Sequence, residues 1–119
     1  RKLVVFGLGK VNSVLPENID QHIDDGYKLI DVREEHEWMA GHHPDAIHIP
    51  MGQIPESMDN FQEKTKYIII CRSGQRSGKV AAYLESQGYE SFNLTGGMRQ
   101  FSEISDNVQD STGKKGNII

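Results

Sequence analysis

Several features that would assign a chain to a class at once are missing from this sequence. Its 119 residues include one cysteine, which excludes an internal disulfide and the small secreted proteins that depend on disulfides. The longest apolar run, residues 67–71, is far shorter than the roughly 20 residues needed to cross a bilayer. The basic and then apolar start is too short in its apolar part for a signal peptide. These absences predict an intracellular, cytoplasmic protein with a reduced cysteine and no membrane partner.

The composition that remains is that of an ordinary globular protein. Hydrophobic residues make up 36% and charged residues 25% of the chain, and its length fits one domain with one core. The net charge of −4 is unevenly distributed: residues 17–45 carry nine acidic and two basic side chains, whereas residues 64–79 carry five basic and no acidic ones. The overall acidity and the lack of an extended basic stripe argue against nucleic acid as a partner. The single cysteine lies within the basic stretch.

Short β-favouring runs alternate with helical stretches along the chain. We expect strands at residues 28–32, 46–49, 67–71 and 91–94, and helices at residues 16–25, 34–40, 55–61, 77–87 and 98–104. This alternation predicts an α/β fold, a doubly wound sheet of about five mostly parallel strands with helices on both faces.

Three segments follow from this pattern. Residues 1–13 are predicted to be an N-terminal extension or the first strand. Residues 14–104 are predicted to form the domain itself. Residues 105–119 are polar and contain glycine, and they are predicted to form a loosely held tail.

The segment Cys71-Arg-Ser-Gly-Gln-Arg-Ser77 joins the most apolar strand to the clearest helix. At the carboxyl end of a strand in such a sheet, backbone N–H groups can form an anion-binding nest, and the next helix adds its positive dipole end. A thiol placed there ionises easily. Arg72 and Arg76 could bind an anionic substrate, and Gly74 permits a turn with positive φ. The alternatives are that Cys71 is merely a small buried hydrophobe and that Ser77 is a helix N-cap.

Two other constellations are weaker. Residues 4–11 imitate the opening of a dinucleotide-binding turn, but Asn12 stands at the third glycine position and Pro16 interrupts the expected helix. The histidines and glutamates of residues 34–48 fit no common metal motif, and solvent-exposed imidazoles are the favoured interpretation. His42 or His43 could still lie at the mouth of the site.

Three motifs, taken together, resemble a single-domain rhodanese, a member of the family of persulfide-forming sulfurtransferases. The resemblance covers residues 14–101. The first motif is Leu29-Ile-Asp-Val-Arg-Glu34 with His36-Glu-Trp38 and residues 41–50, which read GHHPDAIHIP where the family has "GHIPGAxNIP". The second is the cysteine segment, and the third is Leu94-Thr-Gly-Gly-Met98 with Phe101, where the family usually shows "LxGGxxxW". The chain departs from the family at His43, Asp45, His48 and Phe101, and none of these changes removes a reactive group.

The resemblance implies a sulfurtransferase that carries sulfur as a persulfide on Cys71. Four residues separate Cys71 from Arg76, whereas related phosphatases and arsenate reductases have five, so the tighter loop is suited to one sulfur atom. The implied partners are small-molecule sulfur donors and thiol or cyanide acceptors, or an acceptor protein thiol, and no metal or organic cofactor is implied. The alternative is a rhodanese-like interaction or sulfur-relay module with little turnover of free substrates; a phosphatase or arsenate reductase is less favoured.

The residues implied to form the site fall into three groups. Cys71 is the nucleophile. Two residues, Asp31 and Arg33, are implied to support the loop, with Arg33 as the structural partner of nearby carboxylates. The remaining loop residues are implied to bind substrate: Arg72, Ser73, Gly74, Gln75, Arg76 and Ser77.

Overall fold

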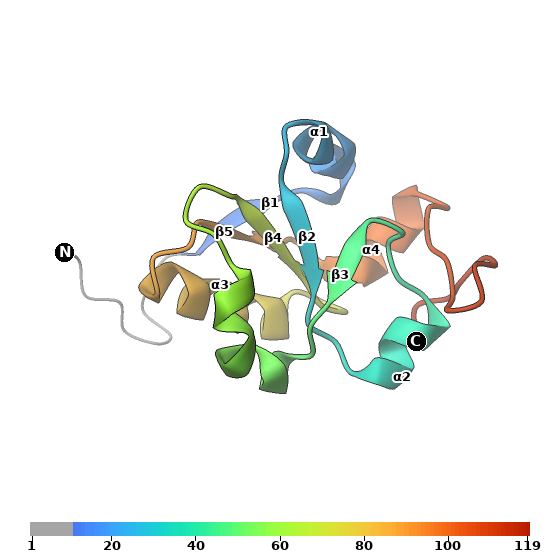
Figure 1. Ribbon diagram of the computed structural model, residues 1–119. Helices are drawn as coiled ribbons and strands as arrows, with labels where there is room; N and C mark the ends of the chain where they lie inside the picture. Colours follow the sequence, from blue (N-terminus) through green and yellow to red (C-terminus); the bar gives the residue numbers. More distant parts are fainter. Residues whose placement is uncertain (1–10) are drawn as a thin grey trace.

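All five strands of the sheet run parallel to their neighbours in this computed structural model, which describes residues 11–119 (Figure 1). The order across the sheet is β1-β5-β4-β2-β3, so β4 is central. The strands are β1 (Asn12–Val14), β2 (Lys28–Asp31), β3 (Ala46–His48), β4 (Tyr67–Ile70) and β5 (Ser91–Leu94). The predicted parallel α/β sheet is thus confirmed, and the suggested dinucleotide-binding turn at residues 4–11 lies outside the described residues except for Val11.

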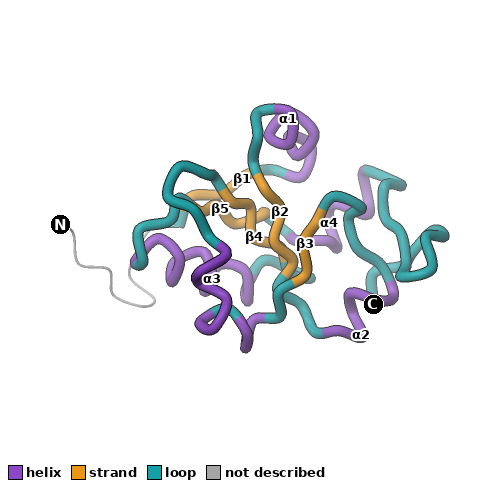
Figure 2. Tube along the Cα trace, in the orientation of Figure 1, coloured by secondary structure: helices purple, strands orange, loops and turns teal. Residues whose placement is uncertain are grey.

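Helices pack on both faces of the sheet, as the tube in Figure 2 shows. Three of the helical segments are 3₁₀ helices, in which each residue bonds to the third one along. The α-helices are α1 (Ile19–Asp24), α2 (Glu35–Ala40), α3 (Gln75–Ser86) and α4 (Gly97–Ile104), and the 3₁₀ helices are η1 (Pro16–Asn18), η2 (Met51–Gln53) and η3 (Pro55–Asn60). None of the helices in residues 11–119 has the length and apolar character that a bilayer crossing requires.

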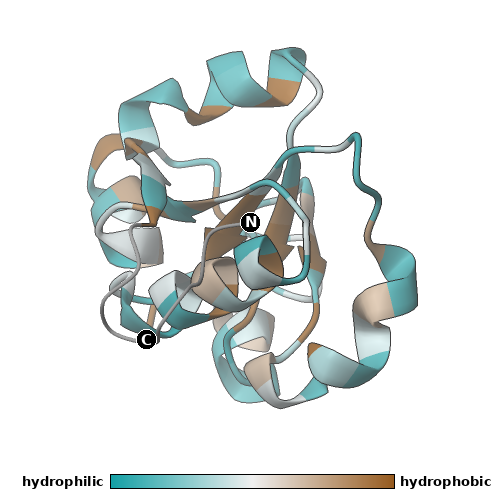
Figure 3. Ribbon diagram, turned by 90° about the vertical axis from the view of Figure 1, so that its left-hand side faces the viewer, coloured by the Kyte–Doolittle hydropathy of each residue, from teal (hydrophilic) through white to brown (hydrophobic). Residues whose placement is uncertain are grey.

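The nearly continuous apolar run of the sequence forms the central strand β4, and burial on both faces explains why that strand must be apolar. All four of its residues are buried, and successive side chains point to opposite faces of the sheet. Ile68 and Ile70 join the apolar cluster beneath α1 and α4, whereas Ile69 and Cys71 join the cluster beneath α3 and η3. Figure 3 shows these brown, hydrophobic strands enclosed by more hydrophilic helices. Cys71 therefore leaves the sheet at its middle.

Helix α3 begins two residues earlier than predicted. Gly74 has a φ of 102°, a left-handed conformation that glycine adopts without strain, and the chain enters the helix at Gln75. The expectation of a positive φ at Gly74 is confirmed. The interpretation of Ser77 as an N-cap is wrong, because Ser77 lies inside the first turn and Gly74 occupies the cap position.

The prediction of a loosely held tail is also wrong. Residues 105–119 return along the domain: Gln109 exchanges two backbone hydrogen bonds with His42, and the Asn117 amide donates to the Ala40 carbonyl. A Cβ atom at Gly116 would lie 2.7 Å from the Gly41 Cα atom, so two glycines allow the backbones to meet. A polar composition concealed this docking, because backbone hydrogen bonds and a single buried valine, Val108, hold the tail. We call residues 105–119 the strap.

Replacing Gly116 with alanine should detach the strap. The added methyl group would meet the backbone of Gly41 and Gln109, and overpacking of this kind typically costs about 1–3 kcal/mol. We expect hydrogen exchange at the Asn117 amide, which bonds to the Ala40 carbonyl, to become faster in proportion to this loss of stability. Gly52→Ala is the matched control, because a Cβ atom at Gly52 has nothing within 4 Å. Unchanged exchange in Gly116→Ala would contradict the close backbone contact.

Candidate functional site

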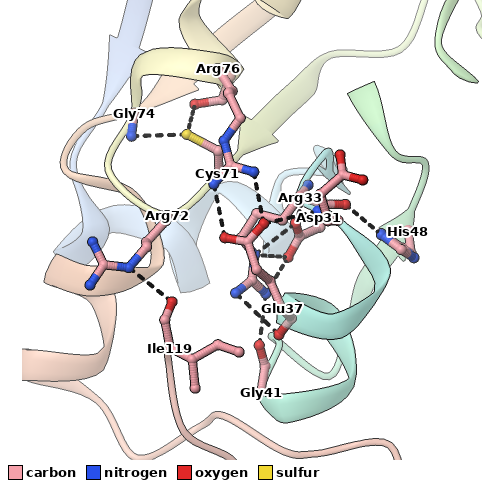
Figure 4. A network of polar contacts seen from close by, with 12 residues as sticks. Asp31, Arg33, Glu37, Gly41, His48, Cys71, Arg72, Gly74, Arg76 and Ile119 are labelled. Carbon is pink, nitrogen blue, oxygen red and sulfur yellow. Dashed lines mark hydrogen bonds and ion pairs between the residues drawn. The ribbon is translucent and has the colours of Figure 1, made fainter. Parts of the chain in front are cut away.

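The candidate site lies where the chain order in the sheet changes direction. From β2 the chain moves outward to β3, and it then returns to place β4 on the other side of β2. The connections that leave the carboxyl ends of β2 and β4 therefore diverge, and such a point is the usual place for a site in sheets of this kind. Arg33 follows β2 and Cys71 follows β4, so the first two sequence motifs meet there (Figure 4).

Hydrogen-bond donors surround the Cys71 sulfur. The Gly74 amide donates to Sγ at 3.0 Å, and the Ser77 hydroxyl lies 3.2 Å from Sγ. Figure 4 shows the sulfur pointing back into its own loop, towards Gly74. Cys71 has no exposed surface and also contacts the apolar cluster beneath α3, so the thiol is at once buried and polar in its contacts.

The balance of these contacts favours the thiolate. Burial alone raises the pKa of Cys71, but the Ser77 hydroxyl and the amides of Ser77, Gly74 and Ser73 outweigh burial, so the pKa lies below its ordinary value. The pKa of Arg76 is raised chiefly by its hydrogen bonds to Glu37, and a negative Cys71 sulfur adds to this rise, so charged Arg76 in turn favours the thiolate. Backbone amides and one hydroxyl thus act as the electropositive surroundings that the sequence predicted.

The third motif, residues 94–101, holds the cysteine segment (Cys71–Ser77, called the cysteine loop below) through contacts with its backbone. Amides at the start of α4 bond to the loop, Met98 to the Cys71 carbonyl at 2.9 Å and Arg99 to the Arg72 carbonyl at 3.0 Å. A Cβ atom at Gly97 would lie 2.5 Å from both of these carbonyl oxygens. Only glycine permits this approach, which explains why a glycine pair accompanies the cysteine segment.

The Arg76 side chain forms an ion pair with a carboxylate of the protein itself. Its two terminal nitrogens donate to Glu37 on α2 at 2.7 and 2.9 Å, a bidentate geometry. The Arg76 hydrogen bonds hold the pKa of Glu37 at about 2 despite burial. Glu37 also accepts the Glu34 amide as part of a capping box at the start of α2. The expectation that Arg76 offers its fork to an anion needs correction, since Glu37 occupies both terminal nitrogens.

Asp31 and Arg33 form an ion pair with no exposed surface. The Arg33 side chain donates to both carboxylate oxygens, and its backbone amide donates to one of them. Arg33 also donates to the Gly41 carbonyl at 2.7 Å, at the end of α2 (Figure 4). The predicted pairing of Arg33 with a carboxylate is present, and it fixes α2 against the end of β2.

The remaining loop residues lie on the outer side. Ser73 and Gln75 are exposed and Arg72 is half-buried. Arg72 Nε donates to the Ile119 carbonyl of the strap at 2.8 Å, so the strap reaches the edge of the candidate site. The structure thus brings Gly74 and Ser77 to the sulfur and directs the arginines to other protein groups.

The histidine expectations are wrong for two residues. His42 and His43 are buried, not exposed imidazoles. The His42 ring stacks on Trp38 with centroids 3.6 Å apart, and His43 packs against Phe101 and accepts the Asp45 amide at Nδ1. Within residues 11–119, no group of three His, Cys, Asp or Glu side chains is arranged to hold a metal ion.

Sequence reasoning missed two residues of the site, Glu37 and Asn93. Glu37 has the spacing of a capping box with Glu34, which marks a helix start but not its ion pair with Arg76. Asn93 lies on β5, and its carboxamide contacts both Ser77 and the Gly74 carbonyl. Asparagine is depleted in strands, so its position inside the predicted strand at residues 91–94 was a signal that could have been used.

Comparison with known protein families gives a match over the region that contains these motifs. The model of the rhodanese-like domain matches residues 15–104. A solved rhodanese-like domain protein from Staphylococcus aureus is 32% identical to this chain and superposes on it with a TM-score of 0.72. The superposition covers 76% of this chain and 91% of the Staphylococcus aureus chain.

Two relatives from Bacillus subtilis bear on chemistry. "Putative sulfurtransferase YtwF" is 45% identical over 86 residues, 72% of this chain and 82% of that protein. "Putative sulfur carrier protein YrkF" is 34% identical over 80 residues, 66% of this chain but 43% of that protein. Proteins similar to this chain are thus named for handling sulfur.

Glu37→Gln should remove a contribution to the free energy of unfolding that is present at neutral pH and lost in acid. In the wild type the pKa of Glu37 falls from 4.5 to about 2 on folding, so its stabilisation is complete above pH 4.5 and is lost as the pH falls towards 2. We expect Glu37→Gln to lower the free energy of unfolding at pH 7 by about 1–2 kcal/mol and to flatten this part of the profile. Urea denaturation from pH 2 to 7 measures both effects. The exposed neighbour Glu35, replaced by glutamine, is the control, and an equal effect there would refute the assignment.

His43 should destabilise the protein on mild acidification. Burial lowers the pKa of His43 below 6.5 against the opposing effect of Asp45 and Asp20, and with the help of His42, so the unfolded chain binds the proton more readily. Stability should therefore fall as the pH drops below 6.5. In His43→Asn, which keeps an acceptor for the Asp45 amide, that slope should disappear between pH 7 and 5. Exposed His36→Asn should keep it, and an unchanged slope in His43→Asn would contradict the buried neutral imidazole.

Proposed function

Because the chain belongs to the rhodanese-like domain family, we propose that it is a sulfurtransferase that carries sulfane sulfur as a persulfide on Cys71. The observation that carries the proposal is the position of the Cys71 sulfur. It accepts a hydrogen bond from the Gly74 amide at 3.0 Å and lies 3.2 Å from the Ser77 hydroxyl. Its thiolate is favoured at the carboxyl end of the central strand, where a nucleophile can be presented to substrate. Relatives named for sulfur transfer and sulfur carriage support the same chemistry.

The first half-reaction is a displacement at sulfur. The Cys71 thiolate attacks the outer sulfur of a donor such as thiosulfate, a new S–S bond forms, and the donor's S–S bond breaks so that sulfite leaves with the electron pair. A thiolate or cyanide acceptor then attacks the terminal sulfur and regenerates the Cys71 thiolate. Loop amides stabilise the negative sulfur in each step.

The loop arginines are proposed to act in different ways. Arg76, held by Glu37, fixes the loop to α2 and contributes positive charge. Arg72 has one nitrogen on the Ile119 carbonyl, and we propose that its other donors meet an anionic donor or acceptor. Ser73 and Gln75, both exposed, are proposed to line the approach to the sulfur.

A relay to a protein thiol is the second candidate, favoured by the similarity to a protein named as a sulfur carrier. In this form the acceptor is the thiol of another protein and turnover of cyanide is slow. We also propose a cytoplasmic location, where the thiol stays reduced between cycles. Comparing transfer rates to cyanide, a small thiol and a protein thiol separates the two candidates.

Incubation with thiosulfate tests the proposal directly. Intact-protein mass spectrometry should show a gain of one sulfur atom, which a thiol reductant removes, and Cys71→Ser should show none because hydroxyl oxygen cannot accept the sulfane sulfur. Glutathione persulfide serves as a second donor. If neither donor adds sulfur to the wild type, or if Cys71→Ser retains sulfur transfer, the proposed function is wrong.

A further inference from the structure

The Ser77 hydroxyl lies between two acceptors but has one hydrogen. Its oxygen is 3.2 Å from the Cys71 sulfur and 2.5 Å from Asn93 Oδ1. Two oxygens come this close only when a hydrogen lies between them, and the amide oxygen carries none. While the thiol is neutral, the Ser77 hydrogen therefore points at Asn93 and Ser77 presents a lone pair to the sulfur; Ser77 becomes a donor to the sulfur only in the thiolate form.

The orientation of the Asn93 carboxamide is fixed by a second contact. Its Nδ2 group donates to the Gly74 carbonyl at 3.0 Å, and a carbonyl can only accept. Reversing the amide would place two oxygens against each other at Gly74, so Oδ1 must face Ser77. The same carbonyl also accepts the Gly78 amide at 3.1 Å, which keeps it partnered without Asn93.

From this geometry we propose that Asn93 is a positioning residue that competes with the Cys71 sulfur for the single hydrogen of Ser77. The inference rests on the proposed role of Cys71 as the nucleophile. Asn93 contacts two groups that reach the sulfur, since it binds the Ser77 hydroxyl and the Gly74 carbonyl while the Gly74 amide donates to Sγ.

Ionisation of the thiol requires the hydrogen to change partner. In the neutral form the Cys71 S–H donates to Ser77, and Ser77 donates to Asn93. When the thiol proton leaves to a base in solution, Ser77 rotates its O–H towards the negative sulfur, and the bond to Asn93 is given up. No covalent bond to Ser77 or Asn93 breaks. Asn93 thus opposes formation of the thiolate, and the sulfur gains the full Ser77 bond only when it is charged.

Asn93→Leu, which has a similar shape but no acceptor, should release the hydroxyl to the sulfur. We expect the apparent pKa of Cys71 to fall and alkylation by neutral iodoacetamide below that pKa to become about tenfold faster. In a Ser77→Ala background the same replacement should change the rate less than twofold. Exposed Ser13→Ala, on the strand paired with Asn93, is the control. Slower alkylation in Asn93→Leu, or an acceleration that persists without Ser77, would overturn the proposal.

Nuclear magnetic resonance of the unmodified Asn93 side chain provides a second measurement if Asn93→Leu does not fold. The Asn93 side-chain carbonyl signal should shift with the midpoint of Cys71 ionisation in the wild type and should lose this shift in Ser77→Ala. The side chain of Asn12 serves as the control. A shift that is the same in Ser77→Ala would reflect the charge of the sulfur alone and would refute the competition. Neither measurement uses a sulfur donor, so their failure is separate from failure of the proposed function.

Discussion

The buried ion pair of Asp31 and Arg33 fixes the two halves of the site relative to each other. Removing one partner of such a pair typically costs about 3–5 kcal/mol, because the other charge stays buried. An apolar pair could replace the ionic energy but not the geometry, since Arg33 also donates to the Gly41 carbonyl at the end of α2. Through α2 this anchor positions Glu37, and Glu37 positions Arg76 beside the cysteine loop. The buried charge is therefore a means of placing a helix.

The cysteine loop combines burial with polarity, and each has a separate consequence. A fully buried thiol would ordinarily stay neutral. Donors within the loop reverse this preference, and the amides at the start of α4 keep the Cys71 and Arg72 carbonyls occupied so that the loop cannot turn its carbonyls towards the sulfur. Gly97 makes that arrangement sterically feasible. The third motif is thus part of the sulfur site although it contacts only the backbone of the loop.

Local pattern was sufficient for the sheet and for the position of the cysteine. Residues 67–70 are nearly all apolar because β4 is buried on both faces, and the segment after such a strand must leave at the carboxyl edge. Contacts between distant side chains were not predictable in this way. Arg76 and Glu37 are 39 residues apart, and Ser77 and Asn93 are 16 apart, so neither pair leaves a periodic signal. The position of the strap could not be predicted from its polar composition, because backbone hydrogen bonds, a glycine contact and a single buried valine, Val108, hold it.

The strap adds a further constraint at the edge of the site. It lies beyond the region matched by the family model, which ends at residue 104, yet it contacts Gly41 of the first motif and Arg72 of the second. Because Arg33 also binds the Gly41 carbonyl, the buried ion pair and the strap both contact this one glycine. A displacement of the strap would therefore shift Arg72 directly and α2 through Gly41. The strap thus links the end of α2 to the Arg72 side chain, which belongs to the second motif.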